Sequence, residues 1–131
     1  MTGVRRLDPD GLVRIPGGLS HCVVVERAGL VFLSGQVAWD EAGRISGDDH
    51  GAQAERIAAA IGLALAAAGT GREHIVKETI YVVGYRPELL PGILAPLRQG
   101  VTSCPASTLV EVVSLAEPGL LVEVEVVAAL P

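Results

Sequence analysis

Two valine-rich segments near the C-terminus contain carboxylates where apolar side chains otherwise dominate. Residues 104–112 read CPASTLVEV and residues 121–127 read LVEVEVV, with a Pro-Gly turn between them. A carboxylate in such a segment must reach water, find a partner, or keep a raised pKa. A carboxylate with a raised pKa in an apolar cleft can activate water as a general base. The carboxylates concerned are Glu111, Glu123 and Glu125; we expect Glu111 and Glu125 to be solvated or ion-paired on the outer sheet face, which leaves Glu123 as the candidate for chemistry.

The remaining chemically active side chains do not form a recognisable metal or cofactor site. His21, His50 and His74 fall in separate segments, and no pair of them has the spacing of metal ligands. Asp48 or Asp49 is well placed to cap a helix, which explains the run Asp48-Asp49-His50 without a metal. The sequence has no glycine-rich phosphate loop and no Ser-His-Asp order. We therefore expect neither a metal nor a cofactor.

Length and composition predict one domain, residues 1–131, with apolar surface left to cover. Half of the residues are hydrophobic and 19% are charged, and the mean hydropathy is +0.46. Isolated domains rarely expose large apolar patches, so we expect the chain to associate with copies of itself. The longest uncharged apolar run, residues 57–69, is shorter than the roughly 20 residues of a membrane span.

Charge and cysteine content indicate which binding partners and which cell compartment to expect. The net charge of −5, with no basic cluster larger than Arg5-Arg6, argues against binding nucleic acid through its phosphates. The first residues lack the apolar core of a signal peptide. Cys22 and Cys104 are isolated, which predicts two small buried thiols in a reduced, cytoplasmic protein. We therefore expect no nucleic-acid partner and no association with a membrane.

Periodicity and turn residues predict six strands and two helices. The expected strands cover residues 12–15, 22–26, 30–34 and 75–83, with two more in the C-terminal segments described above. A helix over about 49–68 follows from one apolar stripe, formed by Ala54, Ile57, Ala58, Ile61, Leu65 and Ala68, which Gly69 ends. Pro87 begins a second helix through about Leu97, which Pro91 and Pro96 keep short or broken.

The predicted order β-β-β-α-β-α-β-β indicates an α+β fold, with both helices on one face of a mixed sheet. The last strand supports this arrangement because its alternate residues differ in character. One face is apolar and suits the helices: Leu120, Val122, Val124, Val126 and Ala128. The opposite face is half apolar and half acidic: Leu121, Glu123, Glu125 and Val127. This second face suits a subunit interface with a cleft better than open water.

Several segments resemble the RidA/YjgF family, also called the Rid or L-PSP family. Residues 30–36 (LVFLSGQ) are close to its Val-Phe-Val-Ser-Gly-Gln signature, and residues 19–23 (LSHCV) resemble its early Tyr-Ser-x-Ala-Val strand. Residues 76–79 (VKET) match its Val-Lys-x-Thr strand, and Gln53 matches a glutamine of its first helix. Pro105-Ala106 and residues 121–125 (LVEVE) match its closing Pro-Ala-Arg and Val-Glu-Ile-Glu strands. The resemblance covers nearly the whole chain.

The resemblance implies a homotrimer with a central barrel-like core and a small-molecule cleft between neighbouring subunits. The best-known members hydrolyse 2-imino and 2-enamino acids to 2-oxo acids and ammonia without a cofactor. In those members an arginine after Pro-Ala holds the substrate carboxylate. A glutamate, a serine, a tyrosine and an asparagine complete the cleft.

Position by position, the resemblance transfers only part of that site. The glutamate is Glu123 and the serine is Ser34, but Ser107 stands where the arginine is expected. The tyrosine becomes Leu19, and the asparagine falls near Gly92 in an ungapped count. Leu109 replaces the small polar residue two positions after the arginine. The chain therefore resembles an arginine-less, divergent branch of the family.

The replaced arginine changes the expected substrate. A serine cannot supply the charge and the two parallel hydrogen bonds of a guanidinium, and each bond to a charged group contributes roughly 1.5–3 kcal/mol. Ser107 and Thr108 could instead hydrogen-bond a neutral ligand, or simply fit their strand. Arg86, in the loop before the second helix, could supply a substitute cation, although such an arginine is more often solvated.

Two functions follow from these residues. The first is cofactor-free hydrolysis of a small neutral imine, enamine or related metabolite, with Glu123 activating water and Ser34, Ser107 and Thr108 orienting the substrate. The second is a ligand-binding or regulatory trimer without chemistry, in which Leu19 and Leu109 make the cleft apolar and Glu123 accepts hydrogen bonds from a neighbouring subunit. A chorismate-mutase-like trimer shares the architecture, but its chemistry needs more arginines than this cleft offers.

Overall fold

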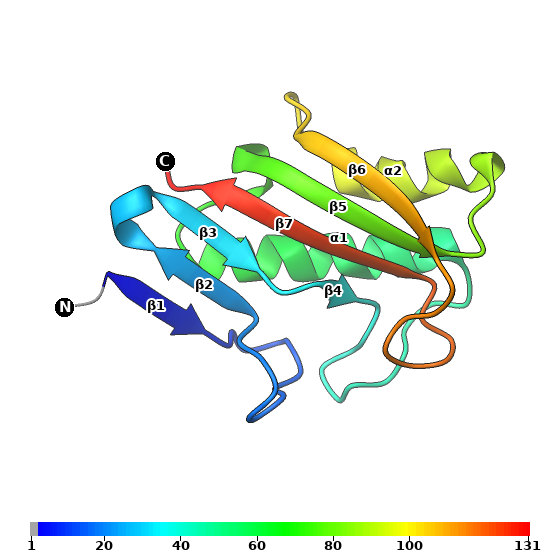
Figure 1. Cartoon of the computed structure of the whole chain (residues 1–131), viewed down its shortest axis with the longest axis horizontal. Helices are drawn as coiled ribbons and strands as arrows, with labels where there is room; N and C mark the ends of the chain where they lie inside the picture. Colours follow the sequence, from blue (N-terminus) through cyan, green and yellow to red (C-terminus); the bar gives the residue numbers. More distant parts are fainter. Residues whose placement is uncertain (1–2) are drawn as a thin grey trace.

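The computed structural model describes residues 3–131, which form one twisted sheet covered on one face by two helices (Figure 1). Its strands are β1 (Val4–Leu7), β2 (Cys22–Val25), β3 (Leu30–Leu33), β4 (Gln36–Val37), β5 (Ile75–Val83), β6 (Ala106–Val112) and β7 (Val122–Ala129). The helices are α1 (His50–Ala67) and α2 (Leu90–Arg98). Three single-turn 3₁₀ helices precede β3, β5 and α2: η1 (Glu26–Ala28), η2 (Arg72–His74) and η3 (Pro87–Leu89).

The strand order places the C-terminal strand at the centre of the sheet. The order is β1-β2-β3-β7-β5-β6, and the short β4 also pairs with β7. Strands β5 and β6 are parallel, with α2 in the connection between them, and all other pairs are antiparallel. The expected α+β class and the two helices on one face are confirmed. Glu123 therefore lies on a strand that is held on both sides, opposite Val37 of β4 and Tyr81 of β5.

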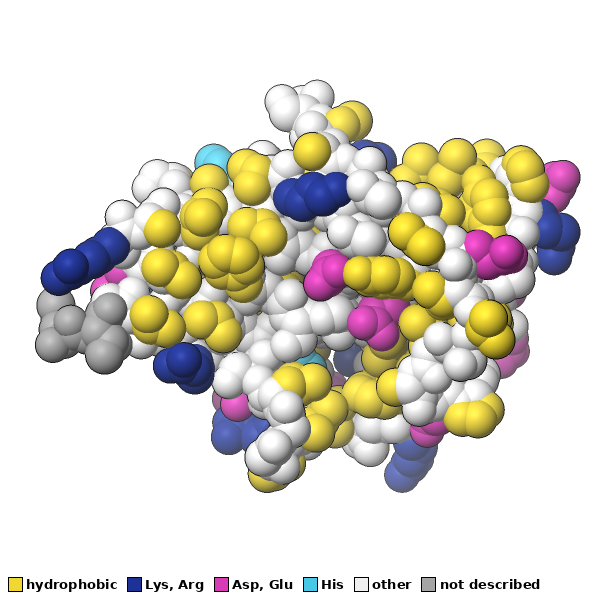
Figure 2. All heavy atoms as spheres, viewed as in Figure 1, with side chains coloured by type: hydrophobic (Ala, Val, Ile, Leu, Met, Phe, Trp, Pro, Cys, Tyr) yellow, Lys and Arg dark blue, Asp and Glu magenta, His cyan; other side chains and the backbone are white. Residues whose placement is uncertain are grey.

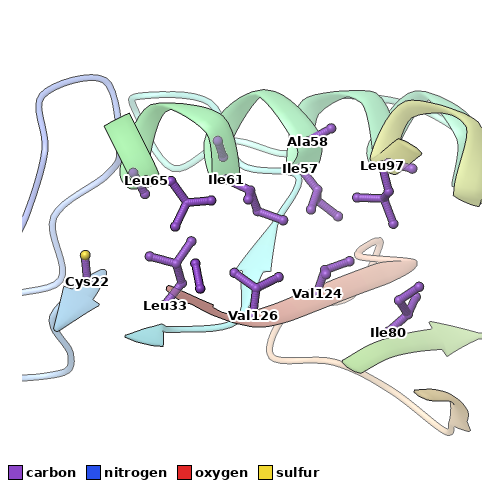
Figure 3. Close-up of a cluster of buried hydrophobic side chains, with 14 of the residues drawn as sticks. Cys22, Leu33, Ile57, Ala58, Ile61, Leu65, Ile80, Leu97, Val124 and Val126 are labelled. Atoms are coloured by element: carbon purple, nitrogen blue, oxygen red, sulfur yellow. The ribbon is translucent and has the colours of Figure 1, made fainter. Parts of the chain in front are cut away.

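Helix α1 forms where its predicted stripe, cap and stop residue agree. The Asp49 side chain accepts a hydrogen bond from the backbone N–H of Ala52 at 2.8 Å, which satisfies one of the free donors at the helix start. All six residues of the predicted stripe are buried. Figure 3 shows Ile57, Ile61 and Leu65 pointing from α1 onto Val124, Val126 and Leu33 of the sheet. Fully burying each such large side chain contributes about 1.5–3 kcal/mol.

The N-terminal prediction was wrong in one element. Residues 12–15 do not form a strand; the edge of the sheet is β1, which pairs with β2 from Val4↔Val25 to Leu7↔Cys22. The carbonyl of Val13 is instead bound by the Nε2–H of the buried His21, at 2.6 Å. The Val13 carbonyl therefore bonds to a side chain and not to the backbone of a neighbouring strand. Strand β4, which the sequence did not predict, has two residues and is too short to show an alternating pattern.

The two cysteines were predicted to be buried, and one of them is. Cys22 is buried as expected, whereas Cys104 is exposed in the loop before β6.

Gln53 fixes the start of β7. Its buried side-chain amide donates to the carbonyls of Gly47 and Gly119, and its oxygen accepts the N–H of Leu121 at 2.8 Å. Three hydrogen bonds from one side chain thus join α1 to the loop that precedes it and to the loop that leads into β7. The register of β7, and with it the position of Glu123, is therefore tied to the core.

Candidate functional site

Glu123 is a half-buried carboxylate on the sheet face that the helices leave open. It alternates with the buried Val122 and Val124, so its side chain points to the opposite face. Burial raises its pKa above the ordinary value of 4.5, and the nearby negative charge of Glu125 raises it further. Within residues 3–131, no group donates a hydrogen bond to this carboxylate or forms an ion pair with it. Glu123 therefore has the environment of a base rather than that of a structural ion pair.

The Glu123 side chain depends on the missing side chain of Gly35. A methyl group built on Gly35 would lie 2.0 Å from Glu123 Oε2 and 2.7 Å from its carboxyl carbon. Real methyl groups essentially never come within 3.0 Å of a heavy atom. The glycine between β3 and β4 thus makes the space that the carboxylate occupies, which is a close-approach role rather than a turn.

Ser34 precedes Gly35 in the chain, and Leu19 lines a hollow with Gly35; Ser34 does not hydrogen-bond Glu123. The Ser34 hydroxyl donates to the carbonyl of Ser20 at 2.6 Å. Leu19 is 40% exposed and lines a hollow of about 20 Å³ together with Gly35 and Trp39. That volume holds about one water molecule and no larger ligand. We call Leu19, Ser34, Gly35 and Glu123 the Glu123 site.

Glu125 differs from its neighbour because it has a partner. The Tyr81 hydroxyl donates to Glu125 Oε1 at 2.5 Å. This hydrogen bond is the main cause of the raised pKa of Tyr81, with desolvation and the two glutamates adding to it. Figure 2 shows acidic side chains at the middle of this sheet face, among apolar ones. The two carboxylates of β7 are therefore distinct, and only Glu123 is unpaired in this part of the chain.

Ser107, Thr108 and Leu109 alternate between the two faces of edge strand β6. Ser107 lies opposite Glu78 of β5, on the helix-covered face, and its hydroxyl donates to Glu78 Oε2 at 2.6 Å. Thr108 lies on the open face, where its hydroxyl accepts from Lys77 Nζ at 2.7 Å. Leu109 packs against the core opposite Ile80. Both hydroxyls thus already have partners inside the chain.

The cation beside Ser107 is Arg98, which the sequence reasoning missed. Arg98 Nη1 donates to Glu78 Oε1 at 2.9 Å, and its Nη2 donates to Glu78 Oε2. This pairing is the main cause of the raised pKa of Arg98. Arg86 instead has a 67% exposed side chain, and its Nε lies 3.7 Å from a Glu88 carboxylate oxygen. We call Glu78, Arg98 and Ser107 the Glu78 cluster.

A signal for this cluster was present in the sequence. Glu78 shares its strand face with Ile80 and Val82, and a carboxylate on a core-facing position needs a cation. Arg98 ends α2, the helix that connects β5 to β6. Its position after Pro96 did not indicate where the side chain would reach.

One chain does not bring the expected site residues together. Glu123 lies opposite Tyr81, three residues along β5 from Glu78, which is about 10 Å at the rise of a strand. Three residues along a strand also means opposite faces. The Glu123 site and the Glu78 cluster are therefore separate within a single chain. Nor do residues 3–131 contain a group of three or more His, Cys, Asp or Glu side chains that could hold a metal ion.

The chain belongs to the L-PSP family, also called the Rid or YjgF family. The family model described as Endoribonuclease L-PSP matches residues 3–130. None of the helices in the described part of the chain is long and apolar enough to cross a membrane.

Solved structures give the same assignment. A protein of unknown function of the conserved Rid protein family from Yersinia pestis is 31% identical, with a TM-score of 0.74 over 98% of this chain and 99% of that one. A protein of unknown function from Pseudomonas aeruginosa is also 31% identical, with a TM-score of 0.82 over 99% of this chain and 94% of that one. A yeast protein at 21% identity has a TM-score of 0.84 over 98% and 99% of the two chains, which shows the shared fold alone. No curated protein matches the chain.

Proposed function

We propose that the protein is a homotrimer of the Rid type that hydrolyses a small, uncharged imine or enamine in clefts between subunits, without a cofactor. The observation that carries this proposal is the unpaired, half-buried carboxylate of Glu123, whose pKa is raised by burial. Maintaining such a charge without a partner costs stability, and functional sites are where this cost is commonly retained.

The trimer is supported by the open face of the sheet. Phe32 and Val110 are each 41% exposed there, beside the carboxylates of β7. A face of this composition is unusual on a monomer and suits a subunit interface. In this proposal a second copy covers the open face and completes the cleft at Glu123. The two free cysteines fit a reducing compartment such as the cytoplasm.

The proposed chemistry needs one base. Glu123 takes a proton from water while the water oxygen attacks the carbon of the C=N bond, and it passes this proton to the nitrogen, which gives a carbinolamine. Glu123 then takes the proton of the carbinolamine hydroxyl and delivers it to the amino nitrogen as the C–N bond breaks, which releases ammonia and the carbonyl product. A base of this kind contributes about 10²–10⁴-fold to the rate.

An uncharged substrate is favoured because Arg98, the guanidinium beside Ser107, is already paired with Glu78. Lys77 donates to the neutral hydroxyl of Thr108 and keeps its charge, but it supplies a point charge rather than the two-pronged contact of a guanidinium. An anionic imino acid would meet the Glu123 and Glu125 carboxylates without a free guanidinium to offset them. Removing a charged ligand group from water without a partner costs several kcal/mol.

The experiment compares two imines released in situ that differ in charge: 2-iminopropionate and the imine of pyruvamide. Wild type should release ammonia faster from the uncharged imine, and light scattering should give about three times the chain mass of 13.5 kDa. Fast hydrolysis of 2-iminopropionate would contradict the assignment of an uncharged substrate. A monomeric enzyme with full activity would contradict the inter-subunit cleft.

The second candidate function is a ligand-binding trimer without chemistry. The exposed Leu19 favours it, because an apolar side chain at the rim of the Glu123 site binds apolar ligands without taking part in a reaction. Ligands found by thermal shift would then be recovered unchanged after incubation. Endoribonuclease activity, which the family description names, has less support because a net charge of −5 disfavours binding to phosphates.

A further inference from the structure

The Glu78 cluster has the form of a carboxylate-binding site that is filled by the chain's own carboxylate. Arg98 presents a two-pronged guanidinium and Ser107 adds a hydroxyl, and all three donors bind Glu78. A guanidinium fork supplemented by a hydroxyl is an arrangement by which proteins hold a ligand carboxylate. The Glu78 side chain is 2% exposed and that of Arg98 is 22% exposed. Glu78 therefore occupies donors that could otherwise take an anion.

The donors of the cluster are accessible from outside the core. Ser107 is an exposed residue of the edge strand. Arg98 lines an open groove of about 950 Å³ between α1 and α2, together with Asp49, Glu55 and Gln99. A small anion could reach the guanidinium from the groove if Glu78 did not hold it. Because Glu78 is attached to the same chain, it acts at a high effective concentration and an external carboxylate cannot compete.

We propose that Glu78 is a specificity-determining residue, an internal carboxylate that satisfies Arg98 and Ser107 and so excludes anionic ligands from this end of the β5–β6 edge. The inference rests on the proposed function, which assumes an uncharged substrate, and it assigns to Glu78 the exclusion of anions at the Glu78 cluster, which is separate from the Glu123 site within one chain. It predicts that Arg98 and Ser107 can still bind an anion and that the carboxylate of Glu78 is the anion they bind now. Removing the charge of Glu78 should therefore create an anion site without adding a cation.

The first experiment measures binding by calorimetry, with pyruvate as the anionic probe and pyruvamide as its uncharged counterpart. Glu78→Gln should bind pyruvate at least tenfold more tightly than wild type. The matched control is Glu55→Gln, which removes one negative charge from the same groove without freeing Arg98 and should leave pyruvate binding at the wild-type level. Pyruvamide should bind all three proteins alike. Equal pyruvate affinity in wild type and Glu78→Gln would overturn the proposal, as would an equal gain in Glu55→Gln.

A second pair of variants keeps the test valid if Glu78→Gln does not fold, because both retain a counterion for Glu78. Ser107→Arg gives two guanidinium groups for one carboxylate, so one is free and pyruvate should bind. Ser107→Arg with Arg98→Gln again gives one guanidinium for one carboxylate, and pyruvate binding should be lost. Retained binding in the double variant would show that Glu78 does not block the site and would overturn the proposal.

These outcomes are separable from those of the proposed function. Pyruvate binding to the Glu78→Gln variant requires no turnover and no role for Glu123 as a base. A chain without any hydrolase activity could still show the predicted charge dependence. Conversely, an active hydrolase whose Glu78→Gln variant binds no pyruvate would keep the proposed function and lose this inference.

Discussion

Gly35→Ala is the substitution that most sharply tests the position of Glu123. The added methyl group would lie 2.0 Å from Glu123 Oε2, 2.7 Å from the carboxyl carbon and 3.0 Å from Cγ. The carboxylate must therefore move by at least about 1 Å to reach the 3.0 Å limit of real contacts, and the whole end of the side chain must turn away. Gly35 does not have a positive φ, so the backbone itself accepts alanine.

The expected cost comes from overpacking. Forcing a packed side chain off its position typically costs about 1–3 kcal/mol. Each kcal/mol corresponds to about 3–5 °C in Tm for a chain of this size, so we expect a fall of roughly 3–15 °C at fixed protein concentration. The proposed hydrolysis should be lost as well, since the base no longer faces its substrate. Thermal unfolding followed by circular dichroism and an ammonia-release assay measure the two effects.

A double-mutant cycle separates the clash from any other effect of the methyl group. In a Glu123→Ala background, Gly35→Ala should cost about 0.5 kcal/mol or less, because the obstructing carboxylate is gone. Gly92→Ala is the matched control: it adds the same methyl group in open space within α2 and should stabilise by up to about 1 kcal/mol. If Gly35→Ala costs the same in both backgrounds, Glu123 does not lie over Gly35 and the described site is wrong.

Three further predictions follow from the described contacts. Arg98→Met should lower the free energy of unfolding in urea by about 3 kcal/mol because it leaves Glu78 buried without a partner. Arg86→Met, which removes an exposed ion pair with Glu88, should cost less than about 1 kcal/mol. Equal costs for the two variants would contradict the structural role of Arg98. The raised pKa of Glu123 means that its contribution to stability is most favourable below 4.5 and is lost as pH rises through the folded-state pKa. Glu123→Gln should therefore melt above wild type at neutral pH and approach it in acid, and a pH-independent difference would count against this account. Asp49→Ala should cost about 1 kcal/mol by removing the N-cap of α1; an unchanged Tm would show that the cap contributes nothing.

Much of the fold could be predicted because local signals agreed with one another. The α1 stripe, its Asp49 cap and Gly69 define one helix, and the alternation of β5 and β7 identifies which face meets the helices. The N-terminal strand was misplaced because residues 12–15 and Val4–Leu7 are both four-residue segments that mix apolar residues with arginine, so their patterns do not distinguish them. The choice between them depends on His21, which binds the Val13 carbonyl from a distant position in the sequence.

The candidate site was less predictable because its decisive contacts are long-range. Alternation places Glu78 on the core face, but only the connection through α2 brings Arg98 to it. Arg86 was the more conspicuous loop arginine in the sequence, yet it lies beside Glu88 on the surface. The role of Gly35 beneath Glu123 depends on the register of β4 with β7, and no local pattern encodes that register.

The most direct measurement of the central claim is the rate of ammonia release from the uncharged imine of pyruvamide by wild type and by Glu123→Gln. Glu123→Gln should remain a trimer and lose about 10²–10⁴-fold in rate, the contribution of a general base. Glu125→Gln, the neighbouring carboxylate bound by Tyr81, should retain most of the activity. An unchanged rate in Glu123→Gln would contradict the assignment of Glu123 as the base.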